Sequence, residues 1–163
     1  MSDHKPVVIE NKYARWRYQI RETVEAGIVL SGQEVKSLKT GHGDLRQAYV
    51  TVRAVGALGK RRHRLVATLL NMFIPPYSKA GPLPGYNPRQ PRRLLFHRDE
   101  LAKLIGQLET PGLTMVPLRV YTSHRRLKVL VGLAAGKTAV DKREVIRRRD
   151  VAREIRRTVL RRR

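Results

Sequence analysis

Glycine and proline are confined to one part of this 163-residue chain, and their distribution limits the fold more than any other feature. All 12 glycines and all 9 prolines lie in residues 1–136, whereas residues 137–163 contain neither. Both residue types interrupt helices and mark turns, so residues 1–136 are divided into short segments. We therefore expect two parts: a domain built largely of short strands, residues 1–136, and a separate arm, residues 137–163.

Several segments between these turn residues carry strand patterns. Residues Val50, Val52 and Ala54 alternate on one face of a half-buried strand, and Leu127–Leu133 alternates in the same way. The segment Thr23–Leu30 is apolar and ends at the turn signal Ser31-Gly32. The predicted strands are Thr23–Leu30, Ala48–Val55, Leu65–Ile74, Leu113–Thr122 and Leu127–Leu133, the last two joined as a hairpin.

Two short helices are expected among the strands. The first is Glu34–Lys39, with Val35 and Leu38 on one face and glycines following it. The second begins near Arg98, because its apolar side chains recur with helical spacing and its first turn is acidic. Those apolar residues are Leu101, Leu104, Ile105 and Leu108.

Five or six short strands with interposed helices favour a mainly β fold. We expect a small closed antiparallel OB-like barrel with two or three short flanking helices and a basic C-terminal tail. The segment GALGKRRHR, residues 56–64, is expected to be an exposed hairpin loop. Residues 78–91, with four prolines and two glycines, are expected to form a long irregular loop.

The formal net charge of +22 indicates a polyanionic partner. Nucleic acid is the first candidate, because lysine and arginine release counterions from phosphates, and an anionic membrane surface is the second. Residues 137–163 alone hold 12 Lys+Arg and 4 Asp+Glu, a net charge of +8. Their apolar residues follow a helical stripe, but this density of like charge predicts an arm that is disordered until it binds.

Nothing in the sequence marks export or membrane insertion. The N-terminal residues lack the apolar core of a signal peptide, and the longest apolar stretch, Leu65–Ile74, is too short to span a bilayer. The absence of cysteine is compatible with a reducing compartment and excludes a cysteine nucleophile or a thiolate metal site. We expect a cytoplasmic protein without membrane attachment.

The sequence offers little for catalysis. The histidines form no metal-ligand pair, and no hydrolase or nucleotide-binding motif is present. Glu25 and Glu34 are either a carboxylate pair for acid–base chemistry or, as we favour, capping and ion-pairing groups beside arginines. We therefore expect no enzymatic activity, no cofactor and no metal. The histidines are His4, His42, His63, His97 and His124.

RNA binding has stronger signals. In the segment Asn11–Tyr18 (NKYARWRY), Lys12, Arg15 and Arg17 alternate with aromatic residues. Cations neutralise phosphates and aromatic rings stack on unpaired bases. Trp16 and Tyr18 are either such stacking residues or core residues beside a cationic face. Two further basic sets follow: Arg89, Arg92, Arg93 and Arg98, and then Arg125, Arg126 and Lys128.

Ordered motifs along nearly the whole chain resemble the SsrA-binding protein family (small protein B), the bacterial partner of transfer-messenger RNA. The segment NKYARWRYQIRETVEAGIVLSGQEVKSLKTG is similar to the N-terminal signature of that family. Further matches are AYV, NMFIPPY, YNPRQPRRLLFHRDEL, GLTMVPLRVY, KVLVGLAAGK and DKRE.

The resemblance implies a role in ribosome rescue. The domain would grip the tRNA-like part of transfer-messenger RNA, and the tail would become a helix in the empty messenger channel, near the small-subunit decoding centre. Carried over from the family, the RNA-facing residues include Asn11, Glu25 and Leu95, whereas the block Glu34–Lys36 is either RNA-facing or structural. The complete predicted RNA-binding set is Asn11, Lys12, Arg15, Trp16, Glu25, Lys36, Arg92, Arg93, Leu95 and Lys128.

In the tail, the resemblance marks a hinge and a ribosome-contacting motif. Gly136 and Lys137 match the hinge, and Asp141, Lys142 and Arg143 match the motif. The chain departs from the family at Val140, where a histidine or an aromatic ring is usual. We expect a monomer whose partners are transfer-messenger RNA and the ribosome. The alternatives are a generic ribosome-associated or RNA-chaperone protein, an RNA-processing enzyme and a membrane-attached protein.

Overall fold

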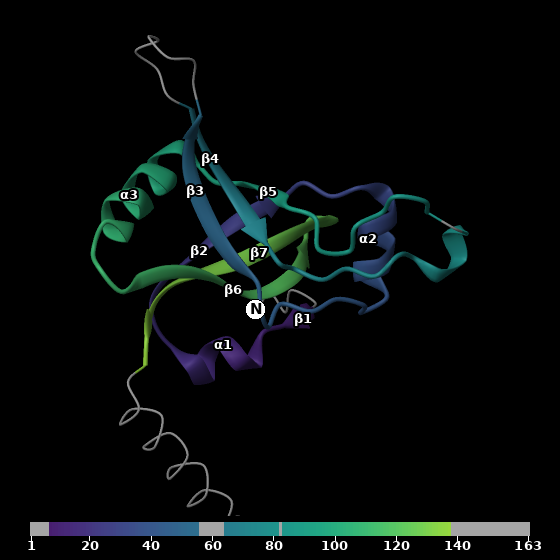
Figure 1. Cartoon of the computed structure of the whole chain (residues 1–163), viewed down its shortest axis with the longest axis horizontal. Coiled ribbons are helices and arrows are strands. Elements are labelled where there is room, and N and C mark those ends of the chain that lie inside the picture. Colours follow the sequence, from purple (N-terminus) through teal and green to yellow (C-terminus); the bar gives the residue numbers. More distant parts are fainter. Residues whose placement is uncertain (1–6, 56–63, 82, 138–163) are drawn as a thin grey trace, which may run out of the picture.

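The computed structural model describes residues 7–55, 64–81 and 83–137. Seven strands, three α-helices and one short 3₁₀ turn (η1) occur in this part of the chain (Figure 1). The strands are β1 Val7–Glu10, β2 Tyr18–Ile28, β3 Tyr49–Val55, β4 Arg64–Leu70, β5 Arg92–Leu95, β6 Leu113–Ser123 and β7 Arg126–Gly136. The helices are α1 Lys12–Arg17, α2 Gly32–Lys39 and α3 Arg98–Leu108, and η1 is Ser78–Ala80.

The strands form one antiparallel sheet that returns on itself. Their order is β1-β6-β3-β4-β5-β2-β7, and an additional pairing between β6 and β7 joins the two ends of the six-strand run from β6 to β7. These six strands therefore make a ring, with β1 added outside it against β6. The joint between β3 and β6 is narrow, since it rests on the pairing of Val50 with Met115. The expectation of a mainly β fold is confirmed.

The main core is formed by the inward faces of the ring strands. Alternation along each strand sends every second side chain inward. On β5, for example, Arg92 and Leu94 are buried whereas Arg93 and Leu95 are exposed. The fully buried apolar side chains include Leu69, Met115, Val120, Val129 and Val131.

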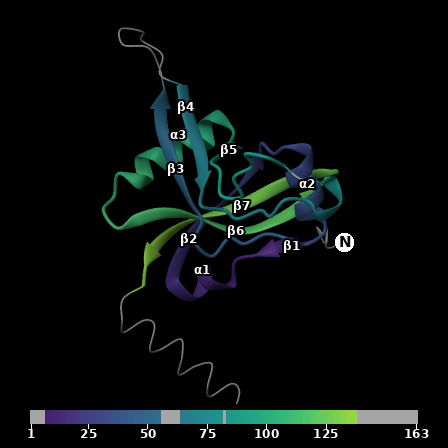
Figure 2. The same ribbon diagram turned by 45° about the vertical axis from the view of Figure 1, so that its right-hand side comes forward.

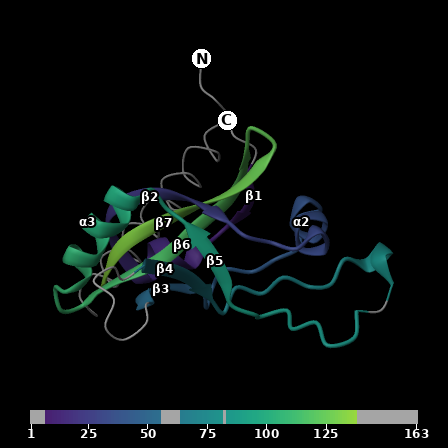
Figure 3. The same cartoon turned by 90° about the horizontal axis from the view of Figure 1, so that it is seen from above.

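The helices lie around this ring. Helices α2 and α3 are found at opposite ends of it in all three views (Figure 1, Figure 2, Figure 3). Helix α3 covers its end with Leu101 and Leu104, as its apolar spacing predicts. Helix α2 begins earlier than expected, because Ser31 is its N-cap: the Ser31 hydroxyl accepts from the Glu34 N–H, and the Glu34 carboxylate accepts from the Ser31 N–H.

Several predicted boundaries are wrong. Strand β2 begins at Tyr18 rather than Thr23, and β4 ends at Leu70 because Asn71 adopts a positive φ of 57° that stops the ladder. Helix α1 and the short strands β1 and β5 were not predicted. None of the helices in the described ranges is long and apolar enough to span a membrane. The predicted loop tip at residues 56–63 and the tail from residue 138 lie outside the described residues.

Candidate nucleic-acid interface

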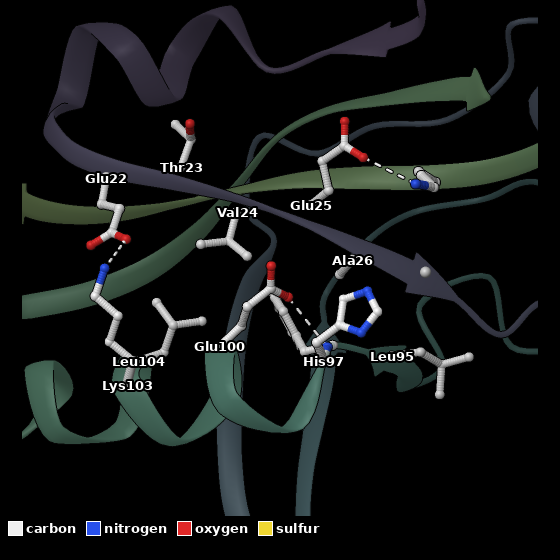
Figure 4. Close-up of a pocket in the computed structure, with 13 residues that line it drawn as sticks. Glu22, Thr23, Val24, Glu25, Ala26, Leu95, His97, Glu100, Lys103 and Leu104 are labelled. Carbon is white, nitrogen blue, oxygen red and sulfur yellow. Dashed lines mark hydrogen bonds and ion pairs between the residues drawn. The ribbon is translucent and has the colours of Figure 1, made fainter.

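A cleft of about 760 Å³ lies between β2 and the first part of α3 (Figure 4). Strand β2 contributes the segment 22–27, the β5–α3 junction contributes Leu95 and His97, and β7 contributes Lys128. On α3, Lys103 donates to the carboxylate of Glu22 over 2.6 Å, and Gln107 donates to the same carboxylate over 3.0 Å. These contacts hold the helix against the strand and fix the walls of the cleft.

Glu25 is one of three acidic residues that line this cleft, together with Glu22 and Glu100. Its carboxylate accepts from the Lys128 ammonium over 3.0 Å, with both side chains partly exposed. Burial raises the pKa of the Tyr121 phenol, and the neighbouring Glu25 carboxylate raises it further. Glu25 is thus paired with a cation at the surface, where it can accept hydrogen bonds from base amino groups or ribose hydroxyls.

Leu95 supplies an apolar surface beside Glu25. It lies opposite Gly27 in the β2–β5 ladder, and its side chain is 50% exposed. A Cβ atom on Gly27 would lie 3.4 Å from the Leu95 Cβ, in ordinary contact distance. Glu25, Leu95 and Lys128, three members of the predicted RNA-binding set, therefore come together at one rim. The fold brings them from three strands that are distant in sequence.

Glu34 belongs to a different network, inside the protein. Its carboxylate accepts from the Arg92 Nε over 2.8 Å and from the Gln90 amide over 3.0 Å. The Arg92 guanidinium also donates to the carbonyls of Met72 and Pro88, and both side chains of the pair are at most 2% exposed. Burial opposes ionisation of Glu34, but the hydrogen bonds from Ser31, Gln90 and Arg92 outweigh it and hold its pKa below the usual range. The alternative of capping and ion pairing is confirmed for Glu34.

This network corrects the prediction that Arg92 faces RNA, because its guanidinium is buried and engaged within the fold. The same holds for Asn11, which is 3% exposed. The Asn11 amide donates to the carbonyls of Leu45 and Pro117, and its oxygen caps α1 by accepting from the Ala14 N–H. Asn11 and Arg92 therefore stabilise the fold beneath the exposed side chains.

Helix α1 presents the predicted aromatic and cationic side chains. Lys12 and Arg15 are exposed, and the half-buried Trp16 packs on Tyr13 with ring centroids 5.4 Å apart. The Arg17 guanidinium lies over the rings of both Tyr13 and Tyr18, 5.9 Å from each centroid. Trp16 joins neither apolar cluster of the core, whereas Tyr18 packs against the small cluster formed by Ala14, Val116, Leu118 and Ala134. Tyr18 is therefore mainly a packing residue.

A second groove, of about 730 Å³, adjoins α1 and was not predicted. Arg46 and Arg89 face it together with Arg17, and Tyr49 lies beside them. Arg89 stacks on Phe73 at 5.4 Å and donates to the Asn71 carbonyl, while Arg46 pairs with Asp44. No local pattern joins these residues, which come from segments far apart in the chain. The fold thus divides the second predicted basic set. Arg89 faces this groove, Arg92 is buried, and Arg93 and Arg98 are exposed elsewhere on the surface.

The remaining predicted residues that the structure describes are not in the lining of either depression. Lys36 is exposed on α2, 5.9 Å from the centroid of Tyr77, and Arg93 is exposed on β5. Gly136 pairs with Tyr18 at the end of β7, and Lys137 follows it with its ammonium bonded to the Arg15 carbonyl. Asp141, Lys142 and Arg143 lie outside the described residues, as does Val140. Within the described ranges, no group of three acidic or histidine side chains is placed to hold a metal ion.

Comparisons with known proteins agree along nearly the whole chain. The model of the SmpB protein family matches residues 8–161. An SsrA-binding protein of Trichodesmium erythraeum is 44% identical over 153 residues, which cover 94% of this chain and 92% of the relative. One from Coprothermobacter proteolyticus is 48% identical over 153 residues, covering 93% and 95%.

A solved structure gives the same result. It is described as "tmRNA-SmpB: a journey to the center of the bacterial ribosome", and one of its chains is 43% identical to this one with a TM-score of 0.64. The match covers 88% of this chain and 96% of that chain. The similarity therefore extends beyond the β2–α3 cleft to the arrangement of the strands.

Proposed function

The chain belongs to the SmpB protein family, and from this membership we propose that it binds the tRNA-like domain of transfer-messenger RNA and delivers that RNA to stalled ribosomes. The observation that carries the proposal is the match, at 43% identity over 88% of this chain, to a chain in a tmRNA–SmpB structure. Local motifs such as a basic run arise in many proteins, whereas an ordered match of this length does not.

The rim formed by Glu25, Leu95 and Lys128 is the surface that we assign to the RNA. Lys128 neutralises a phosphate, Leu95 packs against a base or ribose, and Glu25 accepts a hydrogen bond from a base edge or a 2′-hydroxyl. A carboxylate repels phosphates, so its place at this rim favours recognition of a particular RNA shape over general attraction. Arg93 shares the exposed face of β5 with Leu95 and extends the cationic surface, and Lys36 is a further exposed cation on α2.

Helix α1 provides a second RNA-facing surface through Lys12, Arg15 and Trp16. Asn11 fixes this helix on the ring, and Arg92 fixes the segment that carries β5. We infer that the ring of strands is the OB-like closed barrel expected for this family. Its role is binding rather than catalysis, in the cytoplasm, where ribosomes work.

Residues 137–163 are proposed to act on the ribosome rather than in the first RNA contact. Gly136 and Lys137 set the starting point of this tail, and Asp141, Lys142 and Arg143 are the residues expected to contact small-subunit rRNA. With a net charge of +8, the tail orders when RNA phosphates neutralise its arginines.

A competition experiment tests the proposal. The full-length protein is bound to a labelled transcript of the tRNA-like domain, and unlabelled bulk tRNA is added in increasing excess. We expect the transcript to stay bound at a large excess of tRNA, because the rim recognises base edges, ribose and RNA shape in addition to phosphate charge. Displacement at equal concentration would instead indicate a generic RNA-binding or RNA-chaperone protein.

A further inference from the structure

A groove of about 590 Å³ lies on the other side of Leu95, between β4, β5 and the start of α3. Arg64, Arg93 and Arg98 line it, and Leu65 and Phe96 add apolar surface. All three arginines are exposed. Among the residues that the structure describes, none of the three has an ion pair or a side-chain hydrogen bond. Their guanidinium groups are therefore available to a ligand.

The groove continues the surface already assigned to RNA. On β5 the side chains alternate, so that Arg93 and Leu95 share the outer face at a separation of two residues, about 7 Å. Leu95 borders both the cleft that holds Glu25 and this groove. A ligand that lies on Glu25, Leu95 and Lys128 can thus extend over Leu95 to Arg93 without leaving the protein surface.

The two neighbouring depressions differ in charge. The cleft beside β2 contains three carboxylates, those of Glu22, Glu25 and Glu100. No acidic residue lines the groove of the three arginines. Contacts to phosphates position a nucleic acid and supply affinity, whereas contacts to base edges and ribose supply specificity. The cleft therefore suits recognition, and the groove suits phosphates.

We propose that Arg64, Arg93 and Arg98 bind the sugar–phosphate backbone of the same RNA, next to the part that contacts Glu25 and Leu95. This inference rests on the proposed function. A guanidinium group can donate two parallel hydrogen bonds to the oxygens of one phosphate. The Phe96 ring and Leu65 offer apolar contact to ribose and base. The groove positions the RNA and raises its affinity without changing which RNA is chosen.

The test uses the full chain and the transcript of the tRNA-like domain. The dissociation constant is measured against salt concentration for the wild type, for the double variant Arg93→Gln/Arg98→Gln and for the matched control Lys39→Gln/Lys79→Gln. The control removes the same charge from exposed residues of α2 and η1, which do not line the groove. Hydroxyl-radical footprinting of the bound RNA is recorded for all three proteins, and thermal melting checks that each is folded.

We expect the arginine variant to lose about one unit of salt slope per phosphate contact, roughly two in total, and to lose protection over one continuous stretch of backbone. Its preference for the transcript over bulk tRNA stays unchanged. The control keeps the wild-type footprint and loses less of the slope.

The outcomes separate the inference from the proposed function. If the wild type shows no preference for the transcript, the proposed function fails. If the wild type shows it and the two double variants have the same slope and footprint, the groove does not bind backbone and only the inference is overturned. Binding of a poly-glutamate peptide that depends on Arg93 and Arg98, with RNA binding intact, would assign the groove to an acidic protein and also overturn it.

Discussion

The negatively charged Glu34 side chain lies in the interior, where it forms an ion pair with Arg92. Both side chains are almost completely buried. Removing one partner of such a pair leaves an uncompensated buried charge, so Glu34→Gln should lower the free energy of unfolding by about 3–5 kcal/mol. Urea denaturation measures the loss. The exposed Glu109→Gln serves as control, with a change within about 0.5 kcal/mol. An unaltered midpoint for Glu34→Gln would contradict the assignment of Glu34 to the scaffold.

The same pair predicts a dependence on pH. The pKa of Glu34 is lower in the folded protein than its ordinary value of 4.5, so its contribution is complete above pH 4.5 and is lost as the pH falls through the lower folded pKa. Between neutral pH and strongly acid pH, the wild type should therefore lose more stability than Glu34→Gln. Parallel unfolding curves for the two proteins across this window would show that Glu34 does not titrate as inferred.

Glu25, in contrast to the buried Glu34, lies at the surface beside Lys128. A substitution of Glu25 is therefore expected to change RNA affinity. Glu25→Gln makes the protein more positive, so general electrostatics alone would strengthen RNA binding. If Glu25 accepts a hydrogen bond from the RNA, the variant should bind the tRNA-like domain about tenfold more weakly, as expected for one charge-assisted bond. Filter binding of the variant and of Glu109→Gln at one salt concentration distinguishes the two accounts. Equal or tighter binding by Glu25→Gln would exclude a recognition role.

At the scale of elements, α3 carries one wall of the recognition cleft and one wall of the arginine groove. Gly106 lies in this helix, and an added Cβ would meet no atom within 4 Å apart from the backbone of the helix and the neighbouring residues, so Gly106→Ala should stabilise the protein by about 0.5–1 kcal/mol without altering RNA affinity. Gly132 on β7 is the matched contrast, because its Cβ would lie 3.1 Å from a methyl group of Leu118. Thermal melting should place the two alanine variants on opposite sides of the wild type.

The elements also show what a local pattern reveals and what it does not. Helix α3 and the β6–β7 hairpin follow from apolar spacing within one segment, and both were predicted. Strand β5 escaped prediction because its four residues, RRLL, alternate only when Arg92 is counted as an inward side chain. That position depends on Glu34, 58 residues away in the sequence, so no local window contains the reason. The resemblance to a family was the basis for predicting Glu25 and Leu95 as RNA-facing residues. The groove beside α1 could not be predicted in this way, because only the fold brings its residues together.

At the scale of the molecule, the net charge of +22 is divided between a folded ring and a basic tail. If the ring grips the RNA and the tail acts on the ribosome, deletion of residues 138–163 should leave affinity for the tRNA-like domain largely intact and abolish peptide tagging of stalled chains. The deletion keeps Lys137, whose ammonium is bonded to α1, so the described fold stays complete. Normal tagging by the shortened protein would disprove this division of labour.

If the chain functions as proposed, it selects transfer-messenger RNA among all the RNAs of a bacterial cell. The most direct measurement is to recover the tagged full-length protein from a bacterial lysate at physiological salt and to sequence the RNA bound to it. Transfer-messenger RNA should be enriched far above its share of the lysate, and the Glu25→Gln variant should recover less of it. Recovery of tRNA and rRNA in proportion to their abundance, with no enrichment of transfer-messenger RNA, would contradict the account.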